Sequence, residues 1–303
     1  MKNLISLFDL TPQDAADILQ IAADFKRELA AGKRQAPLAG HVLTQVFEKP
    51  SLRTRLSFEA AMMQLGGSSI FLSPQDAGLN GRESNADVAR VIGGYSDVIV
   101  LRTFAQSLIE EFAQHAGCAV INGLSDDAHP CQALTDLLTM QEAFGALKGH
   151  KLAYIGDGNN VAASLAIACA MFEVPFAIGA PKGYELKPDV VAEVLKKYPK
   201  AQIEQHNDPQ AAVKDADVVY TDVWASMGQE SEKDQRAKVF APYQVNAALM
   251  GAAKRGAKFL HCLPARRGLE VTDEVIDGPD SLAFPQAENR MHLAKGLLVW
   301  LLG

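Results

Sequence analysis

The stretch His41-Val42-Leu43-Thr44-Gln45-Val46-Phe47 has the short apolar pattern of a buried strand. A polar turn follows it at 48–53, and the residues from about Thr54 to Leu65 then indicate a helix. The same order of strand, loop and helix recurs along the chain. Further short apolar strands are predicted at 69–72, 98–102, 119–122, 151–155, 176–179, 218–220 and 257–260.

Strands that alternate with helices predict an α/β fold with two domains, each a mostly parallel sheet flanked by helices. A chain of 303 residues with 48% hydrophobic content is long enough for two cores of about 150 residues each. We expect a first domain at 1–149 and a second at 150–285. The last segment, 286–303, contains a predicted helix with an apolar face, which we expect to pack back on the first domain. In such sheets ligands bind beyond the carboxyl ends of the strands.

The composition argues against several classes of protein. A formal charge of -7 disfavours a nucleic-acid partner. No apolar run reaches the roughly 18 residues expected of a membrane span, so a soluble protein is expected. The four cysteines lie far apart and show no ligand spacing typical of zinc. Neither a disulfide framework nor a metal site is therefore predicted, and a reducing cytoplasm is the expected compartment.

The turn after the first predicted strand is the strongest local candidate for a binding site. Ser51, Arg53 and Thr54 lie where this turn opens a helix. Backbone N–H groups at a helix N-terminus attract anions, and here two hydroxyls and a guanidinium project from the same turn. Such a turn can surround a phosphate without a Walker glycine loop, which the sequence lacks. The alternative is a capping serine followed by solvated arginines.

Three more polar residues of the first half lie at predicted ligand-binding positions. Arg102 ends an apolar strand, at the edge where a parallel sheet presents ligand-binding groups. His129 and Gln132 lie in a turn just before a helix, where both side chains can face a ligand. A loop histidine or a strand-end arginine, taken alone, is equally typical of a structural role.

The second half has a similar set of candidates. Asp222 follows the strand at 218–220 and can pair with an ammonium group, although a helix or turn cap is the alternative. Cys262 follows the strand at 257–260 and is equally compatible with a small buried side chain. Arg290 lies near the start of the last helix, where a solvated surface arginine is the alternative.

A glycine turn at 155–161 partly matches the turn of dinucleotide-binding folds, so a nicotinamide-dependent oxidoreductase has to be considered. The match is imperfect, because Val161 stands where the third small residue is needed. No acidic residue ends a clear strand about 20 positions later. Asn159 and Asn160 offer amide donors and acceptors, which suit a polar amino-acid ligand at least as well.

Taken together, these segments resemble the ornithine carbamoyltransferase family, which shares its fold with the aspartate carbamoyltransferases. The resemblance runs through nearly the whole chain, in order and at compatible spacing. It is carried by SLRTR at 51–55, Arg102, HPCQ at 129–132, DGNN at 157–160, DVWASMG at 222–228, HCLP at 261–264 and ENR at 288–290. The SMG and HCLP motifs are typical of the enzymes that act on ornithine and separate them from those that act on aspartate.

The resemblance implies an enzyme that transfers the carbamoyl group of carbamoyl phosphate to the side-chain amine of L-ornithine, giving L-citrulline and phosphate, in arginine biosynthesis. The implied carbamoyl phosphate site comprises Ser51, Leu52, Arg53, Thr54, Arg102, His129, Gln132, Cys262, Leu263 and Arg290. The implied ornithine site comprises Asn160, Asp222, Ser226 and Met227. Catalytic roles fall on Arg102, His129, Cys262 and Arg290. Neither a metal nor an organic cofactor is implied.

An alkyl amine with a pKa of ~10.4 must lose a proton before it attacks. The sequence leaves open whether Asp222 or Cys262 takes that proton. The resemblance also implies a homotrimer, in which the loop at 77–84 reaches a neighbouring subunit. Three departures from the family pattern are Leu52, Arg266 and that loop. Three alternatives stay open: carbamoyl transfer to another amine such as acylated ornithine or putrescine, the nicotinamide-dependent oxidoreductase, and a non-catalytic binding protein.

Overall fold

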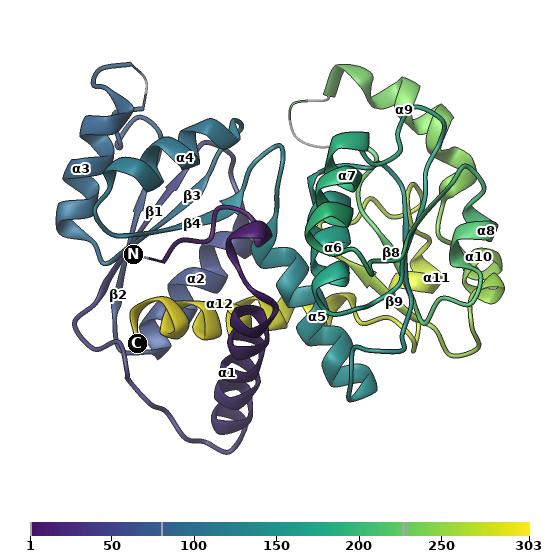
Figure 1. Cartoon of the computed structure of the whole chain (residues 1–303), viewed down its shortest axis with the longest axis horizontal. Helices are drawn as coiled ribbons and strands as arrows, with labels where there is room; N and C mark the ends of the chain where they lie inside the picture. The colour runs from purple at the N-terminus through teal and green to yellow at the C-terminus, as the bar shows by residue number, and fades with distance from the viewer. Residues whose placement is uncertain (1, 80, 226–227, 229) are drawn as a thin grey trace. The chain divides into compact units, whose positions relative to one another are not determined.

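The computed structural model describes residues 2–79, 81–225, 228 and 230–303 (Figure 1). The chain divides into two compact units, one formed by Met1–Leu138 with Glu288–Gly303 and the other by Thr139–Ala287. It passes from one unit to the other within helices α5 (Pro130–Phe144) and α12 (Ala283–Leu302). The sequence-based boundaries at 149 and 285 lie after α5 and in the first turn of α12.

The first unit is built on a sheet of four parallel strands in the order β2-β1-β3-β4. Its strands are β1 (Val42–Phe47), β2 (Ser68–Leu72), β3 (Val98–Arg102) and β4 (Ala119–Leu124). Helices α3 (Asn85–Tyr95) and α4 (Gln106–His115) cover one face, and α2 (Leu52–Gln64) lies on the other (Figure 1). A core of buried aliphatic residues from β1, β3 and β4 packs against α3 and α4, and burial of this kind is the main stabilising term.

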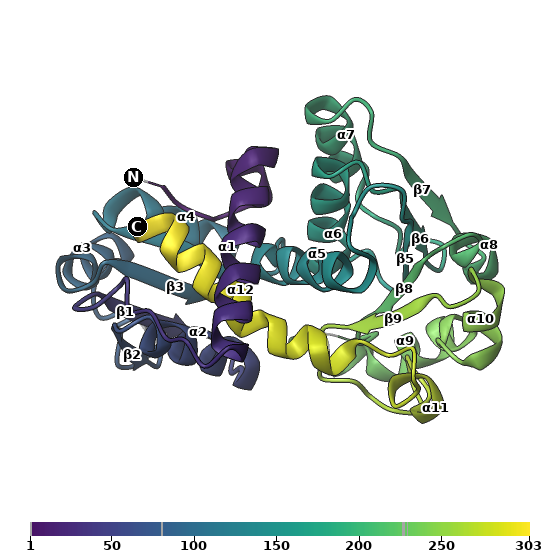
Figure 2. The same ribbon diagram turned by 90° about the horizontal axis from the view of Figure 1, so that it is seen from below.

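Helix α1 (Pro12–Ala30) packs across the carboxyl-terminal part of α12, as Figure 2 shows. Thr11 begins α1 with a capping box, in which its side chain accepts from Asp14 N and the Asp14 carboxylate accepts from Thr11 N. The two helices approach closely at Gly296, where an added Cβ would lie 2.4 Å from Ile18 O. The expected return of the last helix to the first domain is therefore confirmed.

The second unit is built on five parallel strands in the order β7-β6-β5-β8-β9. These strands are β5 (Leu152–Ile155), β6 (Phe176–Gly179), β7 (Ile203–His206), β8 (Val218–Thr221) and β9 (Lys258–His261). The helices around them are α6 (Asn160–Met171), α7 (Pro188–Lys197), α8 (Pro209–Val213), α9 (Lys233–Phe240), α10 (Ala247–Ala252) and α11 (Asp273–Ile276). Short 3-10 helices lie at Leu7–Asp9, Glu230–Glu232 and Ala241–Tyr243.

Each sheet has one point where the strand order reverses. In the first unit the chain proceeds from β1 outward to β2 and then returns to β3, and in the second unit it proceeds from β5 to β6 and returns to β8. Ligands of parallel α/β sheets bind at such a switch point, beyond the carboxyl ends of the strands. The expected α/β fold with two parallel sheets is confirmed. No helix in the described part of the chain has both the length and the hydropathy to cross a bilayer.

Candidate active site

The turn that joins β1 to α2 lies at the switch point of the first sheet. Ser51 is the N-cap of α2, because its side chain accepts from Thr54 N at 3.2 Å. Its hydroxyl also donates to Thr54 Oγ1 at 3.1 Å. The free N–H groups and the dipole of a helix N-terminus make this turn electropositive. Leu52, where the family more often has a hydroxyl residue, is 68% exposed.

Two arginines converge on Thr54 from distant parts of the chain. Arg102, the last residue of β3, donates to Thr54 Oγ1 at 3.4 Å, and Arg290 of α12 donates to the same atom at 3.0 Å. Arg290 also donates to Gln132 Oε1, and Gln132 in turn donates to Asp136 at 2.8 Å. All five side chains are buried. With Ser51, three donors therefore converge on one hydroxyl oxygen, which has only two lone pairs.

His129 lies in the same buried cluster as Thr54, Arg102 and Arg290. Its Nε2 lies 3.4 Å from Arg290 Nη1, and because a guanidinium only donates, Nε2 is the accepting nitrogen of this contact. Burial, and then the charges of Arg290, Arg102 and Arg53, hold the pKa of His129 well below its usual range. The imidazole is therefore neutral near neutral pH and keeps one N–H for donation.

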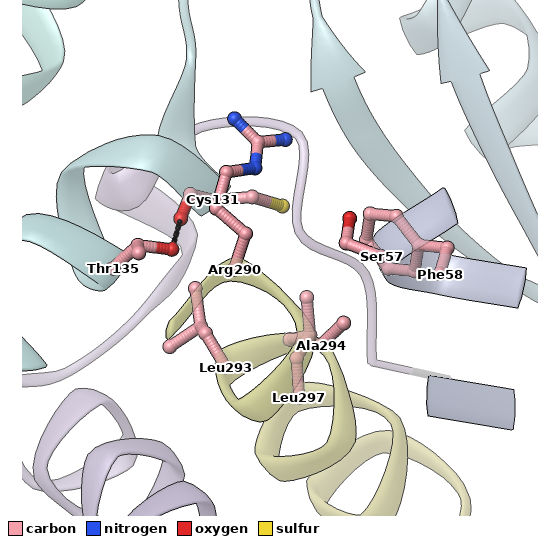
Figure 3. Close-up of a pocket in the computed structure, with 8 residues that line it drawn as sticks. All are labelled: Ser57, Phe58, Cys131, Thr135, Arg290, Leu293, Ala294 and Leu297. Carbon is pink, nitrogen blue, oxygen red and sulfur yellow. Dashed lines mark hydrogen bonds between the residues drawn. The ribbon is translucent and has the colours of Figure 1, made fainter. Parts of the chain in front are cut away.

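A narrow, mostly apolar pocket lies beside the side chain of Arg290 (Figure 3). Leu293, Ala294 and Leu297 extend from the same face of α12 as Arg290. Thr135 donates to the carbonyl oxygen of Cys131 at 2.7 Å, which holds the first turn of α5 beside this pocket. Ser57, Phe58, Cys131 and Thr135 form the rest of the lining. The packing around the stem of Arg290 fixes the direction in which its guanidinium points.

Lys49 is a residue of this turn that the sequence did not single out. Its side chain is 4% exposed and forms an ion pair with Asp126, and its ammonium group lies 4.4 Å from the ring centroid of Phe104. Glu48 accepts from Phe104 N at 2.9 Å. The loops after β1, β3 and β4 are thus tied together. The signal in the sequence was the position of Lys49 two residues before Ser51, in the polar segment that follows the first strand.

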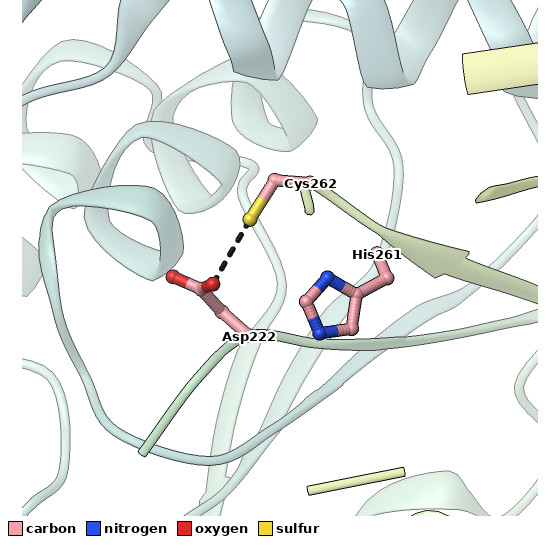
Figure 4. A group of neighbouring side chains, drawn as sticks. All are labelled: Asp222, His261 and Cys262. Carbon is pink, nitrogen blue, oxygen red and sulfur yellow. Dashed lines mark hydrogen bonds between the residues drawn. The ribbon is translucent and has the colours of Figure 1, made fainter. Parts of the chain in front are cut away.

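In the second unit, Asp222 follows β8 and Cys262 follows β9. Figure 4 shows the Cys262 thiol pointing at the carboxylate of Asp222, with Sγ 3.0 Å from Oδ1. The same oxygen accepts from Val223 N at 2.8 Å, and Oδ2 accepts from Asn159 Nδ2 at 3.1 Å. Asp222 and Cys262 are both buried. Asp222 follows β8, which borders the switch point of the second sheet, and Cys262 follows the adjacent strand β9.

His261 holds the backbone that follows β9. Its Nδ1 accepts from Leu263 N at 2.9 Å, and its Nε2 faces the buried carboxylate of Glu270 at 3.2 Å. Leu263 has φ of 57°, which is rare and strained for a branched residue and marks a conformation fixed by its surroundings. Arg266, one of the departures from the family pattern, donates its backbone N–H to the same Glu270 oxygen.

Asp222, His261 and Cys262 each offer one potential metal-ligand atom within 4.8 Å of the others (Figure 4). Both ring nitrogens of His261 already make contacts, one with Leu263 N and one with Glu270. A metal ion would have to break at least one of them. We therefore assign this group to hydrogen bonding rather than to metal ligation.

Arg236 of α9 is a second residue that the sequence did not single out. Its Nη1 donates to Asp157 at 2.7 Å and to the carbonyl oxygen of Trp224 at 3.1 Å. Its Nε donates to Glu232 at 2.8 Å. Burial raises the pKa of Asp157, and the Arg236 guanidinium opposes that shift. One buried guanidinium thus joins the glycine turn to the loop that follows β8.

The remaining predicted site residues lie in the second unit or outside the described part of the chain. Asn160 is the first residue of α6, immediately after the cap residue Asn159. Ser226 and Met227 lie outside the described residues, as does Asn80 in the loop at 77–84. The structure thus brings together Thr54, Arg102, His129, Gln132 and Arg290 in one unit, and Asp222 and Cys262 in the other. Their roles toward substrates stay predictions.

Comparison with known proteins gives matches along the whole chain. Residues 2–142 match the model of the aspartate/ornithine carbamoyltransferase carbamoyl-P binding domain, and residues 148–301 match that of the Asp/Orn binding domain. The chain belongs to the aspartate/ornithine carbamoyltransferase family.

Several relatives in this family are similar over their full length. The ornithine carbamoyltransferase of Anoxybacillus flavithermus is 52% identical over 99% of this chain and 96% of its own length. That of Bacillus subtilis is 53% identical over 98% of this chain and 92% of its own. The solved ornithine carbamoyltransferase from Pyrococcus furiosus is 46% identical, with a TM-score of 0.96 over 100% of this chain and 97% of that chain.

Proposed function

We propose that this protein is an ornithine carbamoyltransferase, which forms L-citrulline and phosphate from L-ornithine and carbamoyl phosphate. The observation that carries the proposal is the convergence of Ser51, Arg102 and Arg290 on the hydroxyl of Thr54. Such an excess of donors over acceptors suits an anionic ligand with several oxygens. The full-length relatives named ornithine carbamoyltransferase support the same assignment.

The first unit is proposed to bind carbamoyl phosphate. Ser51, Leu52, Arg53, Thr54 and Arg102 would hold the phosphate, with the N-terminal N–H groups of α2 behind them. His129 and Arg290 would donate to the carbamoyl oxygen, where charge develops as nitrogen attacks. Each preorganised donor of this kind typically contributes on the order of 3 kcal/mol to transition-state stabilisation. Gln132 accepts from Arg290 and thus orients it.

The second unit is proposed to bind the amino acid through Asn160, Asp222, Ser226 and Met227. A buried carboxylate such as that of Asp222 is suited to an ammonium group, since the pair neutralises the charge of both partners. Cys262 lies 3.0 Å from this carboxylate. We propose that this pair lies near the ornithine amine that loses a proton, and that Cys262 and Leu263 also contact the carbamoyl group.

Two other activities make different predictions. A nicotinamide-dependent oxidoreductase needs open space beside the second glycine of its turn, where the pyrophosphate approaches. At Gly158 that space is filled, because an added Cβ would lie 2.4 Å from the carbonyl oxygen of Glu185. Carbamoyl transfer to acylated ornithine or putrescine would use the same first unit and differ only in the amino-acid site.

The identity of the amine substrate is tested by comparing four acceptors with the purified protein. Ornithine, N-acetylornithine, putrescine and aspartate are supplied separately with carbamoyl phosphate, and the carbamoylated product is measured by mass spectrometry. We expect kcat/KM for ornithine to exceed that for each other amine by at least a hundredfold. A higher value for any other amine would reassign the substrate, and NADH binding without carbamoyl transfer would favour the oxidoreductase.

We further propose a cytoplasmic homotrimer, or a multiple of trimers, that serves arginine biosynthesis. One relative, 47% identical, is named an anabolic ornithine carbamoyltransferase. All four cysteines are buried thiols, which suits a reducing compartment. Leu52, Leu56 and Met63 are all more than half exposed on one face of α2, and exposed apolar faces of this kind are typical of subunit interfaces.

The trimer is tested by light scattering and by mixing two inactive variants. If the loop at 77–84 reaches a neighbouring site, Arg53→Ala chains mixed with chains altered at Arg82 should recover part of the activity. The subunits must be exchanged first, and native mass spectrometry verifies mixed trimers. Mixed trimers without recovered citrulline synthesis would count against shared sites, and an active monomer would refute them.

A further inference from the structure

Asn159 lies in the glycine turn between β5 and α6, and its side chain contacts both the first turn of α6 and the carboxylate of Asp222. Its Oδ1 accepts from Val161 N at 2.9 Å and from Ala162 N at 3.1 Å, which makes it the N-cap of α6. The hydroxyl of Tyr154 donates to the same oxygen at 3.3 Å. Burial, and then the charge of Asp222, hold the pKa of Tyr154 well above its usual range, so this phenol stays a donor.

These contacts fix which way the Asn159 amide points. Two backbone N–H groups and a phenol all need an acceptor, and only the amide oxygen can serve them. The NH2 group is therefore directed to the opposite side, where Nδ2 lies 3.1 Å from Asp222 Oδ2. The other Asp222 oxygen accepts from Val223 N and from Cys262. Both oxygens of the carboxylate are thus held by donors of fixed position.

The backbone around Asn159 is equally constrained. Gly158 donates its N–H to Tyr184 O at 2.7 Å, and its Cα lies so close to Glu185 that a side chain would collide with the backbone there. The cap residue cannot shift without moving this contact or the first turn of α6. Its amide is therefore a rigid reference point for the carboxylate that follows β8.

From this geometry we propose that Asn159 is a positioning residue of the ornithine site, which aims the Asp222 carboxylate at the ammonium group of the substrate. It acts through Asp222 and does not need to touch the substrate. The inference rests on the proposed function, because it takes Asp222 as the partner of the amino-acid substrate. The family resemblance places the motif at 157–160 near that site and assigns a ligand role to Asn160, whereas this inference gives Asn159 a separate role, which is to orient Asp222.

The two tasks of Asn159 can be separated by a single substitution. Asp is as good an N-cap as Asn and is favoured by the helix dipole, so Asn159→Asp keeps the cap of α6. The ionised carboxylate that this change introduces cannot donate to Asp222. It places a negative charge where Nδ2 now lies 3.1 Å from Asp222 Oδ2, and this charge repels the Asp222 carboxylate. A residue that only caps the helix would tolerate this change, and a positioning residue would not.

We expect Asn159→Asp to raise KM for ornithine at least tenfold at pH 8 and to leave KM for carbamoyl phosphate within twofold. Two carboxylates this close share a proton as the pH falls, and the protonated one can then donate as the amide did. The ratio of variant to wild-type KM for ornithine should therefore decrease toward lower pH. The matched control is Asn246→Asp, which makes the same change at the N-cap of α10, where Asn246 accepts from Leu249 N at 3.0 Å.

A second variant and a second readout keep the test informative. Asn159→Ser keeps a capping oxygen without the added charge, so it should raise KM for ornithine with no recovery at low pH. Alkylation of Cys262, followed by peptide mass spectrometry, needs no substrate. The added charge near the thiol disfavours the reactive thiolate, so alkylation at a given pH should slow in Asn159→Asp and not in Asn246→Asp.

The possible outcomes distinguish failure of the positioning role of Asn159 from failure of the proposed ornithine carbamoyltransferase activity. Wild-type protein that forms no citrulline would refute the proposed function, while slower Cys262 alkylation in Asn159→Asp would still support the link from Asn159 to Asp222. Active wild-type protein whose Asn159→Asp variant keeps its KM for ornithine at every pH would overturn the positioning role. Equal effects of Asn159→Asp and Asn246→Asp would overturn it as well.

Discussion

The guanidinium of Arg290 donates to the hydroxyl of Thr54 at 3.0 Å. This hydrogen bond joins the last helix of the chain to the turn after the first strand, although 236 positions separate the two residues. The return of the carboxyl-terminal helix to the first unit makes this contact possible. Without that return, the buried cluster around Thr54 and His129 would lack one of its charges.

Arg53→Ala should severely lower affinity for carbamoyl phosphate and leave KM for ornithine nearly unchanged. Hydrogen bonds to charged groups contribute about 1.5–3 kcal/mol, which corresponds to a roughly 10- to 150-fold loss. Steady-state kinetics and thermal protection by carbamoyl phosphate measure this. Arg255→Ala, which removes the same charge from an exposed turn, is the matched control. An Arg53→Ala protein with wild-type affinity and turnover would remove Arg53 from the phosphate site.

Asp222→Asn should weaken the binding of ornithine at least tenfold more than the binding of carbamoyl phosphate. A neutral amide replaces the carboxylate that is proposed to face the ammonium group of ornithine. The measurement is KM for each substrate at fixed saturating concentrations of the other. The amide is nearly isosteric, so the fold should be retained. Equal weakening of both substrates would indicate a structural effect instead.

Cys262→Ser should keep the fold and react more slowly, since the hydroxyl can still donate to Asp222 but is a different acid. We expect kcat to fall more than KM for ornithine rises. The pH dependence of kcat, measured for wild type and variant, checks whether the thiol takes part in proton loss. A variant with the wild-type rate at every pH would exclude such a part for Cys262.

His129 should make the protein less stable in mild acid. Its pKa in the folded protein lies well below 6.5, so the unfolded chain binds a proton that the folded protein does not. The free energy of unfolding should therefore fall as the pH drops below about 6.5, by at most about 1.4 kcal/mol per pH unit, and His129 should contribute no such slope above that pH. Urea unfolding at pH 7.5, 6.5 and 5.5 measures this, and His129→Gln should flatten the acid limb. Parallel curves for both proteins would contradict the depressed pKa.

Arg236→Lys should raise KM for ornithine about tenfold, equivalent to about 1.4 kcal/mol. A lysine ammonium cannot reproduce the fork that reaches Asp157, Glu232 and the Trp224 carbonyl together. Arg267→Lys is the matched control, because Arg267 bonds Asp273 and Asp277 on the surface. We expect the control to keep wild-type kinetics; the same loss in both variants would argue against a specific effect on the ornithine site.

The sequence predicted the strands that are apolar runs. It missed elements and boundaries that depend on contacts with distant parts of the chain. The buried strands at 98–102 and 176–179 were predicted at their observed bounds, because both are short apolar runs. The strand β7 was missed, since its residues are largely polar and partly exposed at the sheet edge. The last helix was predicted within 286–303, whereas α12 begins earlier, at Ala283, because Pro285 is tolerated in the first turn.

Site residues were predictable where a motif ends a strand, and not where a side chain reaches in from elsewhere. Arg102 ends β3, and Thr54 lies in the first turn of the helix that follows the neighbouring strand β1, so their proximity follows from the topology. Arg236 lies on a polar helix, and only the structure shows that it contacts the glycine turn 79 positions earlier. Asn159 was noted as a possible ligand, whereas its contact with Asp222 depends on how β5 pairs with β8.

The most direct test of an ornithine carbamoyltransferase is the simultaneous measurement of citrulline and phosphate in one reaction. Purified protein is mixed with ornithine and carbamoyl phosphate, and both products are quantified over time against a reaction without ornithine. We expect equal amounts of citrulline and phosphate, and phosphate release in the control that does not exceed spontaneous decay. Phosphate released without citrulline, or no product at all from a folded and correctly assembled protein, would contradict the proposed function.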